Sequence, residues 1–341
     1  MAQGYVVPPK QPPQLNIPKS DVTVKVSCVD STSRLDLGPL GPFLQPDYTG
    51  RNKLLGPALS FLIEHPQRKP VLFDLAIRKD FHVLPSYPKF VEMKWGIHVD
   101  KDVSTILKEN GVDVDGGAIQ SIIWSHHHWD HVGNPTLFPG STELVVGPGS
   151  KDMYLPGYLE RQDSILMATD FEGRNVRELS FDDSFKIGRF RAFDFFGDGS
   201  FYLLDTPGHS VGHMCGLART STHPDTFIFM GGDASHHGGE FRPTDYSPLP
   251  KELNPMPPRR RNQGEFDAHE KVLLLMAHDD SVIDPPQSDF YPKTMNYWYE
   301  KGVGKRVKWL FLGDFEGVVK ANQRGEEVFT WGEHSSWDYY G

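Results

Sequence analysis

The sequence predicts an α/β fold, and three features of the chain lead to this prediction. Apolar runs of strand length recur along the 341 residues, separated by segments rich in glycine and proline. At least one segment has apolar side chains at the three- and four-residue spacing of an amphipathic helix. Histidine and aspartate residues directly follow several apolar runs, so polar groups gather at the ends of predicted strands. Layered folds of this class can exceed about 200 residues within one domain.

The predicted strands follow one another along most of the chain. Residues 1–20 are rich in proline and poor in apolar side chains, which predicts an extended N-terminal arm before a single domain over residues 21–341. In the first predicted strand, residues 22–28, every second side chain is apolar. Further strands are predicted at residues 58–64, 71–77, 118–125, 143–146, 190–196, 201–205, 214–218, 226–230, 272–277 and 307–312.

The clearest helical pattern lies at residues 102–110. Three apolar side chains share one face there, and Gly111 supplies a stop. A second, short helix is predicted at residues 267–271. Residues 240–264 are rich in proline and predict an irregular excursion long enough to lie over an active face.

The composition argues against several classes of protein. The formal net charge of −10 disfavours binding to nucleic acid or to anionic membranes. The apolar runs are far shorter than a membrane span, and the N-terminal residues lack the apolar core of a secretory signal. Two cysteines are present, Cys28 and Cys215, and neither has a metal-ligand spacing. We therefore expect a cytoplasmic protein with two buried, reduced thiols.

Four potential metal ligands lie close together in the sequence. His126, His128, Asp130 and His131 form the pattern H-x-H-x-D-H. Imidazole and carboxylate groups suit a borderline divalent ion such as zinc, and clustering supplies enough ligand atoms to hold one. The alternative interpretation is a histidine-rich surface patch, but this pattern rarely arises by chance. The motif predicts a metal site.

Three further potential ligands come from distant parts of the sequence. His209, Asp233 and His278 each lie in a loop that directly follows an apolar run. Loops at one edge of a rigid sheet can assemble a site from such residues. We therefore expect these side chains to join the H-x-H-x-D-H motif.

Taken together, these motifs resemble the metallo-β-lactamase superfamily. The matching pieces, in the order of the family, are H-x-H-x-D-H at 126–131, T-P-G-H at 206–209, G-D at 232–233 and the final His278. The resemblance covers roughly residues 55–315. It implies an αββα four-layer sandwich with two metal ions at one edge of the paired sheets.

The resemblance also implies a role for each ligand. The first ion would be held by His126, His128 and His209, and the second by Asp130, His131 and His278. Asp233 would bridge both ions, and Asp74 would support the ligands without binding metal. We expect two divalent ions, zinc in the first place, with iron or manganese as alternatives.

Finer similarity favours a lactone as the substrate. D-A-S at 233–235, A-H-D at 277–279 and T-P-G-H-S-V-G-H at 206–213 are similar to motifs of N-acyl homoserine lactonase-like members. This resemblance implies a hydrolase in which metal-bound hydroxide attacks the carbonyl of a lactone or another carboxylic ester. The substrate would be a small molecule with an apolar part. His213 would support the site rather than bind metal.

Proton transfer and substrate contact are assigned to residues beside the metals. Asp130 or Asp233 can carry a proton to the leaving group. The lactonases place a tyrosine three residues after the bridging aspartate, where this chain has His236, so we expect His236 to contact the substrate carbonyl instead. Trp129 lies inside the metal loop and either lines the substrate pocket or packs against the base of that loop.

Other reactions are compatible with the same metal site. An acyl thioesterase is the first alternative. A phosphodiesterase or nuclease is less favoured, because its best support is the run Arg259, Arg260 and Arg261, and such short charge runs are usually solvated. An iron-dependent oxygenase on the same fold is a third alternative, which the complete hydrolytic ligand set disfavours. Association as a homodimer is left open.

Overall fold

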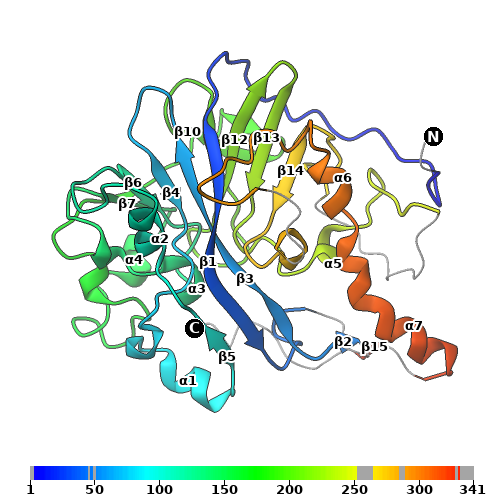
Figure 1. The fold of residues 1–341 in the computed structure, drawn as a ribbon, viewed down its shortest axis with the longest axis horizontal. Coiled ribbons are helices and arrows are strands. Elements are labelled where there is room, and N and C mark those ends of the chain that lie inside the picture. Colours follow the sequence, from blue (N-terminus) through cyan, green and yellow to red (C-terminus); the bar gives the residue numbers. More distant parts are fainter. Residues whose placement is uncertain are drawn as a thin grey trace.

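Two β-sheets pack face to face in the computed structural model (Figure 1). The structure describes residues 4–44, 47–48, 51–251, 264–283, 289–326 and 329–330. The first sheet, in spatial order, consists of β5 (Gly96–His98), β1 (Lys25–Leu37), β3 (Leu54–Glu64), β4 (Val71–Phe73), β6 (Ser121–Ile123), β7 (Glu143–Val146) and β8 (Val176–Glu178). The second consists of β14 (Val272–Leu275), β13 (Asp225–Met230), β12 (Met214–Thr222), β11 (Phe201–Asp205), β10 (Phe190–Asp194) and β9 (Lys186–Ile187). A separate pair joins β2 (Asp47–Tyr48) to β15 (Phe329–Thr330).

Both sheets combine parallel and antiparallel strands. In the first sheet β1, β3, β4 and β5 pair antiparallel, whereas β4, β6, β7 and β8 run parallel. In the second sheet β14 is parallel to β13, and the other pairs are antiparallel. Because parallel neighbours end at the same edge, the loops after β4 and β6 emerge together, as do those after β13 and β14.

The main core lies between the two sheets. Phe61 and Phe73 of the first sheet and Leu203 and Ile228 of the second are almost completely buried in one cluster. Burial of each such side chain contributes about 1.5–3 kcal/mol. This packing holds the strand ends, and therefore the loops that follow them, in fixed relative positions.

Helices flank the paired sheets. They are α1 (Tyr87–Glu92), α2 (Val103–Glu109), α3 (Trp129–Val132), α4 (Ser150–Tyr154), α5 (Gly238–Phe241), α6 (Val303–Val307) and α7 (Glu316–Gln323), with 3₁₀ turns at Phe81–Val83, Pro135–Leu137, Ala168–Asp170, Asp280–Val282 and Leu310–Phe315. The helices α2, α3 and α4 bury apolar side chains against the first sheet. Phe241 of α5 packs on the outer face of the second sheet. The layers therefore follow the order helices, first sheet, second sheet, helices, which confirms the predicted αββα sandwich.

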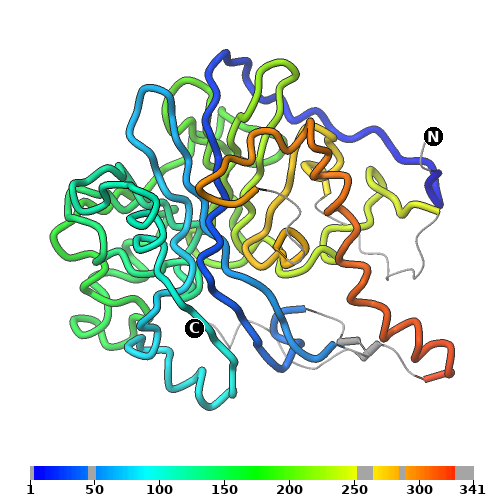
Figure 2. The backbone as a smooth tube through the Cα atoms, viewed as in Figure 1, coloured from blue at the N-terminus to red at the C-terminus, as the bar shows by residue number. Residues whose placement is uncertain are grey.

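The N-terminal residues run as an extended segment along the second sheet, drawn in dark blue in Figure 2. The amide of Val6 donates to the carbonyl of Leu249 at 2.8 Å, and the amide of Gly188 donates to the carbonyl of Leu15 at 2.7 Å. Leu15 is buried in the apolar cluster on the outer face of that sheet, which the composition of the arm did not indicate. Of the predicted proline-rich excursion at 240–264, residues 252–263, with the three arginines, lie outside the described residues.

Two predicted elements are wrong. Residues 307–312 form the end of α6 and part of a 3₁₀ turn rather than a strand. Val303, Val307 and Phe311 are all buried at a spacing of four, so the helical period decides this segment. Residues 267–271 form turns rather than a helix, because the Asp267 carboxylate is held by Arg242, with a 2.6 Å contact to Nη2, and too few residues follow to propagate a helix.

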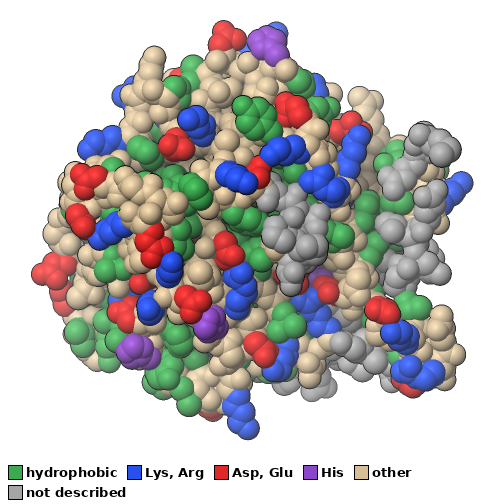
Figure 3. All heavy atoms as spheres, in the orientation of Figure 1, with side chains coloured by type: hydrophobic (Ala, Val, Ile, Leu, Met, Phe, Trp, Pro, Cys, Tyr) green, Lys and Arg blue, Asp and Glu red, His purple; other side chains and the backbone are tan. Residues whose placement is uncertain are grey.

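The surface drawn in Figure 3 mixes charges of both signs, with Lys and Arg side chains interspersed among Asp and Glu. Cys28 and Cys215 are buried and unpaired, as expected for reduced thiols. Among the helices that the structure describes, none is long and apolar enough to cross a membrane.

Candidate metal centre

Four loops meet at one edge of the paired sheets and bring seven ligand residues together. They follow β6, β11, β13 and β14. The structure arranges their side chains as two groups, in each of which one ligand atom per residue lies within 4.8 Å of the others. The first group is His126, His128, His209 and Asp233, and the second is Asp130, His131, Asp233 and His278. Every predicted ligand therefore lies in a group, and Asp233 lies in both.

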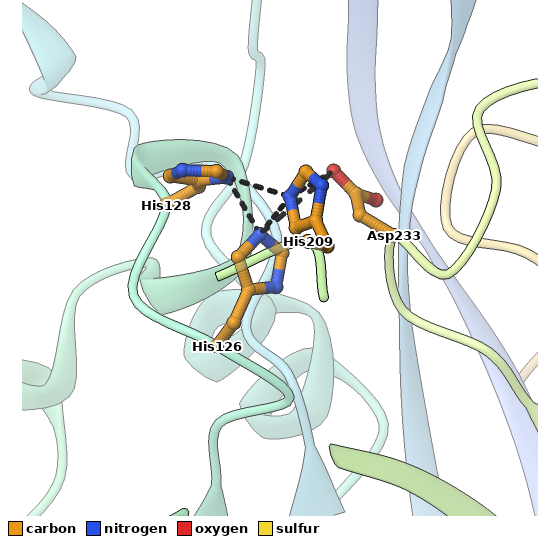
Figure 4. A group of neighbouring side chains, drawn as sticks. All are labelled: His126, His128, His209 and Asp233. Atoms are coloured by element: carbon orange, nitrogen blue, oxygen red, sulfur yellow. Dashed lines mark hydrogen bonds and ion pairs between the residues drawn. The ribbon is translucent and has the colours of Figure 1, made fainter. Parts of the chain in front are cut away.

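The first group presents three imidazole nitrogens to one point (Figure 4). His126 Nε2 lies 2.8 Å from His128 Nδ1, and His209 Nε2 lies 3.1 Å and 2.9 Å from these two atoms. Tetrahedral zinc with Zn–N bonds of about 2.0–2.1 Å requires nitrogens about 3.3 Å apart. The three nitrogens can therefore bind one small divalent ion if they move slightly further apart.

In the second group a carboxylate oxygen and two imidazoles converge. Asp233 Oδ1 lies 3.0 Å from His131 Nε2 and 3.2 Å from His278 Nε2, and Asp130 Oδ2 lies 3.4 Å from His278 Nε2. Three atoms of this group, Asp130 Oδ1, His131 Nε2 and Asp233 Oδ1, are buried without a hydrogen-bond partner among the described residues. Buried polar atoms normally have partners, so these atoms fit a bound ion.

Asp233 connects the two groups through its two oxygens. Oδ1 faces His131 and His278, whereas Oδ2 lies 3.6 Å from His209 Nε2 and 3.8 Å from His126 Nε2. Gly232 precedes it with φ +51°, and a Cβ there would lie 2.9 Å from the Ser125 side chain. Only glycine allows this close approach without strain.

Asp74 orients one imidazole of each group. Its Oδ2 accepts a hydrogen bond of 2.9 Å from His131 Nδ1 and one of 2.8 Å from Ser125 Oγ, which in turn accepts one of 3.0 Å from His126 Nδ1. Its Oδ1 accepts from the Ser125 amide at 2.6 Å. These bonds fix the tautomers that leave both Nε2 lone pairs for metal. Asp74 also has φ +59°, which ends β4 earlier than predicted.

Ser125 was not singled out from the sequence. Its only local signal is that it immediately precedes the H-x-H-x-D-H motif. The hydroxyl acts as a relay because a single carboxylate, Asp74, is too short to reach both His126 and His131 directly.

Replacing Asp74 by asparagine is expected to weaken metal binding about 10- to 100-fold while leaving the fold intact. Asparagine has one acceptor oxygen, so it cannot accept both from the Ser125 amide, which now donates to Oδ1, and from His131 and the Ser125 hydroxyl, which now donate to Oδ2. Competition with a chromophoric chelator measures this affinity. Asp115→Asn, at a side chain that is 76% exposed, is the matched control. Equal affinity in the two variants would contradict the role of Asp74.

His213 supports Asp233 through the backbone. The Asp233 amide donates to His213 Nε2 at 3.2 Å, and His213 Nδ1 donates to the Thr206 carbonyl at 3.1 Å. His213 is therefore placed behind the bridging residue and outside both ligand groups. His213, the second histidine of the T-P-G-H-S-V-G-H motif, therefore contacts the backbone of Asp233 and not the proposed ions.

Burial and neighbouring charges divide the histidines into two electrostatic classes. Burial, together with adjacent imidazoles, holds the pKa values of His126 and His128 well below the usual range, so both are neutral ligands at pH 7. Burial alone would also lower the pKa of His131, but the carboxylates of Asp233, Asp130 and Asp74 raise it well above the usual value. The second group is thus the more anionic of the two.

The metal-free protein is expected to lose stability as pH falls below about 6.5. Burial lowers the pKa of His213 to about 4, so the unfolded chain binds a proton there that the folded chain cannot hold. This residue alone should cost between about 1 and 2 kcal/mol between pH 6.5 and pH 5. Thermal melts of chelated protein across that range measure the loss. A chelated His213→Gln variant with an equally steep loss would contradict this assignment.

Trp129 and His236 both lie near residues of the first group. Trp129 is buried in α3 against Phe90, with ring centroids 4.5 Å apart, and lines a cavity that His128 also lines. His236 Nε2 lies 3.3 Å from Asp233 Oδ2, and its side chain is only 11% exposed. Its Nδ1 donates to the carbonyl of Phe43 at 3.2 Å. Trp129 therefore both packs against Phe90 and lines a cavity, and contact of either residue with a substrate stays a prediction.

Comparison with known proteins assigns the family. Residues 55–259 match the metallo-beta-lactamase superfamily. The chain belongs to this superfamily. The ligand motifs in sequence order and the αββα sandwich agree with that membership, so the resemblance stated from the sequence is confirmed.

Two curated relatives in the superfamily are similar over most of this chain. It is 43% identical to the protein named cytochrome P450 monooxygenase mpaDE' of Penicillium brevicompactum, over 92% of this chain but only 40% of that protein. The chain therefore spans less than half the length of that relative. It is 38% identical to gamma-lactamase FDB1 of Fusarium pseudograminearum, over 89% of this chain and 85% of that protein.

Solved structures of the superfamily share the fold. An AiiA mutant of B. thuringiensis with N-decanoyl-L-homoserine bound at its active site matches with a TM-score of 0.56. The match covers 80% of this chain and 99% of that chain, at 18% sequence identity. At this identity the likeness concerns the fold alone.

Proposed function

We propose that this protein is a dinuclear metal-dependent hydrolase that cleaves a lactone or another carboxylic ester. The observation that carries the proposal is the Asp233 carboxylate, whose two oxygens face two different groups of buried ligand atoms. We assign His126, His128 and His209 to the first ion, Asp130, His131 and His278 to the second, and Asp233 to both. The mixed imidazole and carboxylate set suits zinc, with iron or manganese as alternatives.

The similarity to a protein named gamma-lactamase supports a cyclic carbonyl compound as the substrate. A cyclic amide and a cyclic ester present the same carbonyl geometry and differ in the leaving atom. We therefore place lactones first and include γ-lactams among the compounds to be tested.

The residues around the ligands are suited to hydrolysis. When bound, a pair of divalent ions lowers the pKa of water and polarises a carbonyl oxygen. Burial raises the pKa of Asp130, and the nearby Asp233 carboxylate adds to this effect. The Oδ1 atom of Asp130 makes no hydrogen bond among the described residues, so one carboxylate oxygen remains free to accept a proton. We propose that Asp130 carries the proton to the departing oxygen, with Asp233 as the alternative carrier.

We propose that His236 donates a hydrogen bond to the substrate carbonyl. Because Nδ1 faces the Phe43 carbonyl, it must carry a proton, and Nε2 can donate only if the ring is an imidazolium. In the metal-free protein, burial alone would lower the pKa of His236, but the Asp233 carboxylate raises it to about 9, which favours the imidazolium at pH 7. Nε2 lies 3.3 Å from Asp233 Oδ2 but makes no hydrogen bond of regular geometry among the described residues, and we propose that a bound substrate carbonyl accepts from it.

Metal analysis of the purified protein, combined with a substrate panel, tests the proposal. The panel contains γ-lactones, γ-lactams, acyl thioesters, phosphodiesters and β-lactams. We expect close to two divalent ions per chain and the highest kcat/KM on a lactone or other carboxylic ester. A protein that holds two ions and cleaves only thioesters or only phosphodiesters would replace this proposal with the corresponding alternative.

A further inference from the structure

The turn that carries His236 is held by the carboxylate of Glu240. Glu240 lies in α5, the short helix that follows this turn (Figure 1). Its Oε2 accepts a hydrogen bond of 2.7 Å from the backbone amide of His236. The Ser235 hydroxyl lies 3.0 Å from the same oxygen, and its one proton goes either there or to the carbonyl of His237, 2.8 Å away. Because hydrogen bonds to a charged acceptor are among the stronger ones, Glu240 holds the peptide group of His236 firmly.

The local sequence explains this contact. His237 is the N-cap of α5, and its Nδ1 accepts a hydrogen bond of 3.1 Å from the amide of Gly239. Glu240 is the third residue of the helix, a position from which a glutamate can reach back to an amide that precedes the first turn. Here it reaches one residue beyond the N-cap, to the amide of His236. The sequence H-H-G-G-E at 236–240 therefore forms a capping arrangement that also binds the turn in front of the helix.

The next residue of the turn is anchored to the C-terminal part of the chain. His237 Nε2 lies 2.9 Å from Asp314 Oδ2. The His237 ring also meets the ring of Phe311 edge-on, with centroids 5.5 Å apart. A Cβ at Gly238 would lie 2.7 Å from the Phe311 ring, so glycine allows this close packing. With His237 fixed, the contact with Glu240 decides how the preceding peptide is oriented.

The ring of His236 depends on this peptide for its position. Nδ1 donates to the Phe43 carbonyl at 3.2 Å, and Nε2 lies 3.3 Å from Asp233 Oδ2. Both distances are at the long end of the hydrogen-bond range, so these contacts restrain the ring only weakly. A shift of the main chain therefore moves Nε2 relative to the ligand groups. A misplacement of about 1 Å in a reacting site can lower the rate about 100-fold.

We propose that Glu240 is a positioning residue for the hydrolysis, which holds the peptide of His236 so that Nε2 faces the substrate carbonyl. The inference rests on the proposed function, in which His236 donates a hydrogen bond to that carbonyl. Glu240 belongs to neither group of ligand atoms, so its replacement leaves all seven ligands in the chain. Glu240 acts through the reach of its side chain to one amide. Its effect therefore depends on the length of the side chain more than on its charge.

Substitutions at position 240 separate reach from charge. Glu240→Gln keeps an acceptor oxygen at the same reach, so kcat on the preferred lactone should stay within about 3-fold of the wild-type value. Glu240→Asp keeps the charge but is one methylene shorter, and Glu240→Ala has no acceptor. Both should lower kcat about 10- to 100-fold while two ions are retained and KM changes little.

Glu240→Asp is the measurable variant if Glu240→Ala does not fold. Glu172→Ala, at an exposed glutamate in a turn, controls for the loss of an acidic side chain. A kcat that falls as far in Glu240→Gln as in Glu240→Asp would overturn the inference, because the charge of the side chain and not its reach would then be required.

A double-mutant cycle shows whether Glu240 acts through His236. In the His236→Phe background, Glu240→Ala should lower kcat by less than about 2-fold, because the side chain that it positions is already absent. A loss of about 10-fold or more in both backgrounds would make Glu240 merely structural and overturn the inference. An unchanged kcat in His236→Phe beside an impaired Glu240→Ala would also overturn it. The hydrolase proposal survives both results.

Hydrogen exchange at the His236 amide supplies a readout without turnover. In protein with isotopically labelled histidine, His236→Phe identifies the amide resonance by its absence. We expect this amide to exchange at least about 10-fold faster in Glu240→Asp than in the wild type or in Glu240→Gln. Equal rates in the wild type and Glu240→Asp would contradict the inference. Faster exchange in a protein that hydrolyses none of the panel would support the positioning of His236 by Glu240 and reject the proposed reaction.

Discussion

Asp233→Ala is expected to lose both bound ions and to lower kcat/KM by at least about 10⁴-fold. The side chain supplies one oxygen to each ligand group, so its removal weakens both sites at once. A loss of 10⁴ corresponds to about 5–6 kcal/mol of transition-state stabilisation, which is within the range that metal ions supply. Metal content by mass spectrometry and kcat/KM on the preferred lactone measure the two losses. The melting temperature should fall as well, because bound ions stabilise the folded state.

His128→Ala provides a contrast, because His128 belongs to the first group only. We expect it to lose the first ion and most of the activity. Asp115→Ala, at an exposed carboxylate, controls for the loss of an acidic side chain. An Asp233→Ala protein that still holds two ions per chain would remove Asp233 from the bridging position, and a fully active wild type with one ion per chain would reject the dinuclear centre.

His236→Phe should lower kcat about 10²- to 10³-fold while both ions are retained. This is the cost commonly measured when one donor to a developing oxyanion is removed. The donor form requires the imidazolium, because Nδ1 is used by the Phe43 carbonyl, and phenylalanine supplies no donor at all.

Three comparisons decide the role of His236. His98→Phe changes an exposed histidine, whose side chain is 67% exposed, and controls for the substitution itself. His236→Tyr places a neutral donor at the same position, and partial recovery of kcat would support activation of the carbonyl by a hydrogen bond. Loss of one ion from His236→Phe would instead make His236 a metal ligand through its Nε2 lone pair. An unchanged kcat would exclude both roles.

Local sequence predicted the residues of the candidate centre far better than the shape of its surroundings. The H-x-H-x-D-H motif places four ligands within six consecutive positions. His209, Asp233 and His278 were recognised because an apolar run precedes each of them. Strands at 143–146 and 201–205 were predicted with their observed bounds, since short apolar runs there are bounded by polar or glycine residues. The prediction of a strand at 307–312 was wrong because a short apolar run fits a strand or a helix equally well. The helical spacing becomes visible only when the preceding residue Val303 is considered together with this run.

By itself, the sequence determined the family, the sandwich fold and the chemical types of the ligands, because these depend on residue identity, spacing and the order of motifs. Only the tertiary structure decided that the two oxygens of Asp233 face different groups and that Ser125 relays Asp74 to His126. Asp74 and Ser125 are 51 positions apart, and the cavity that Trp129 lines joins α1 to residues 162–165. Contacts of this range arise from the packing of two sheets and their covering segments, and no local pattern of apolar and polar residues records which side chains that packing brings together.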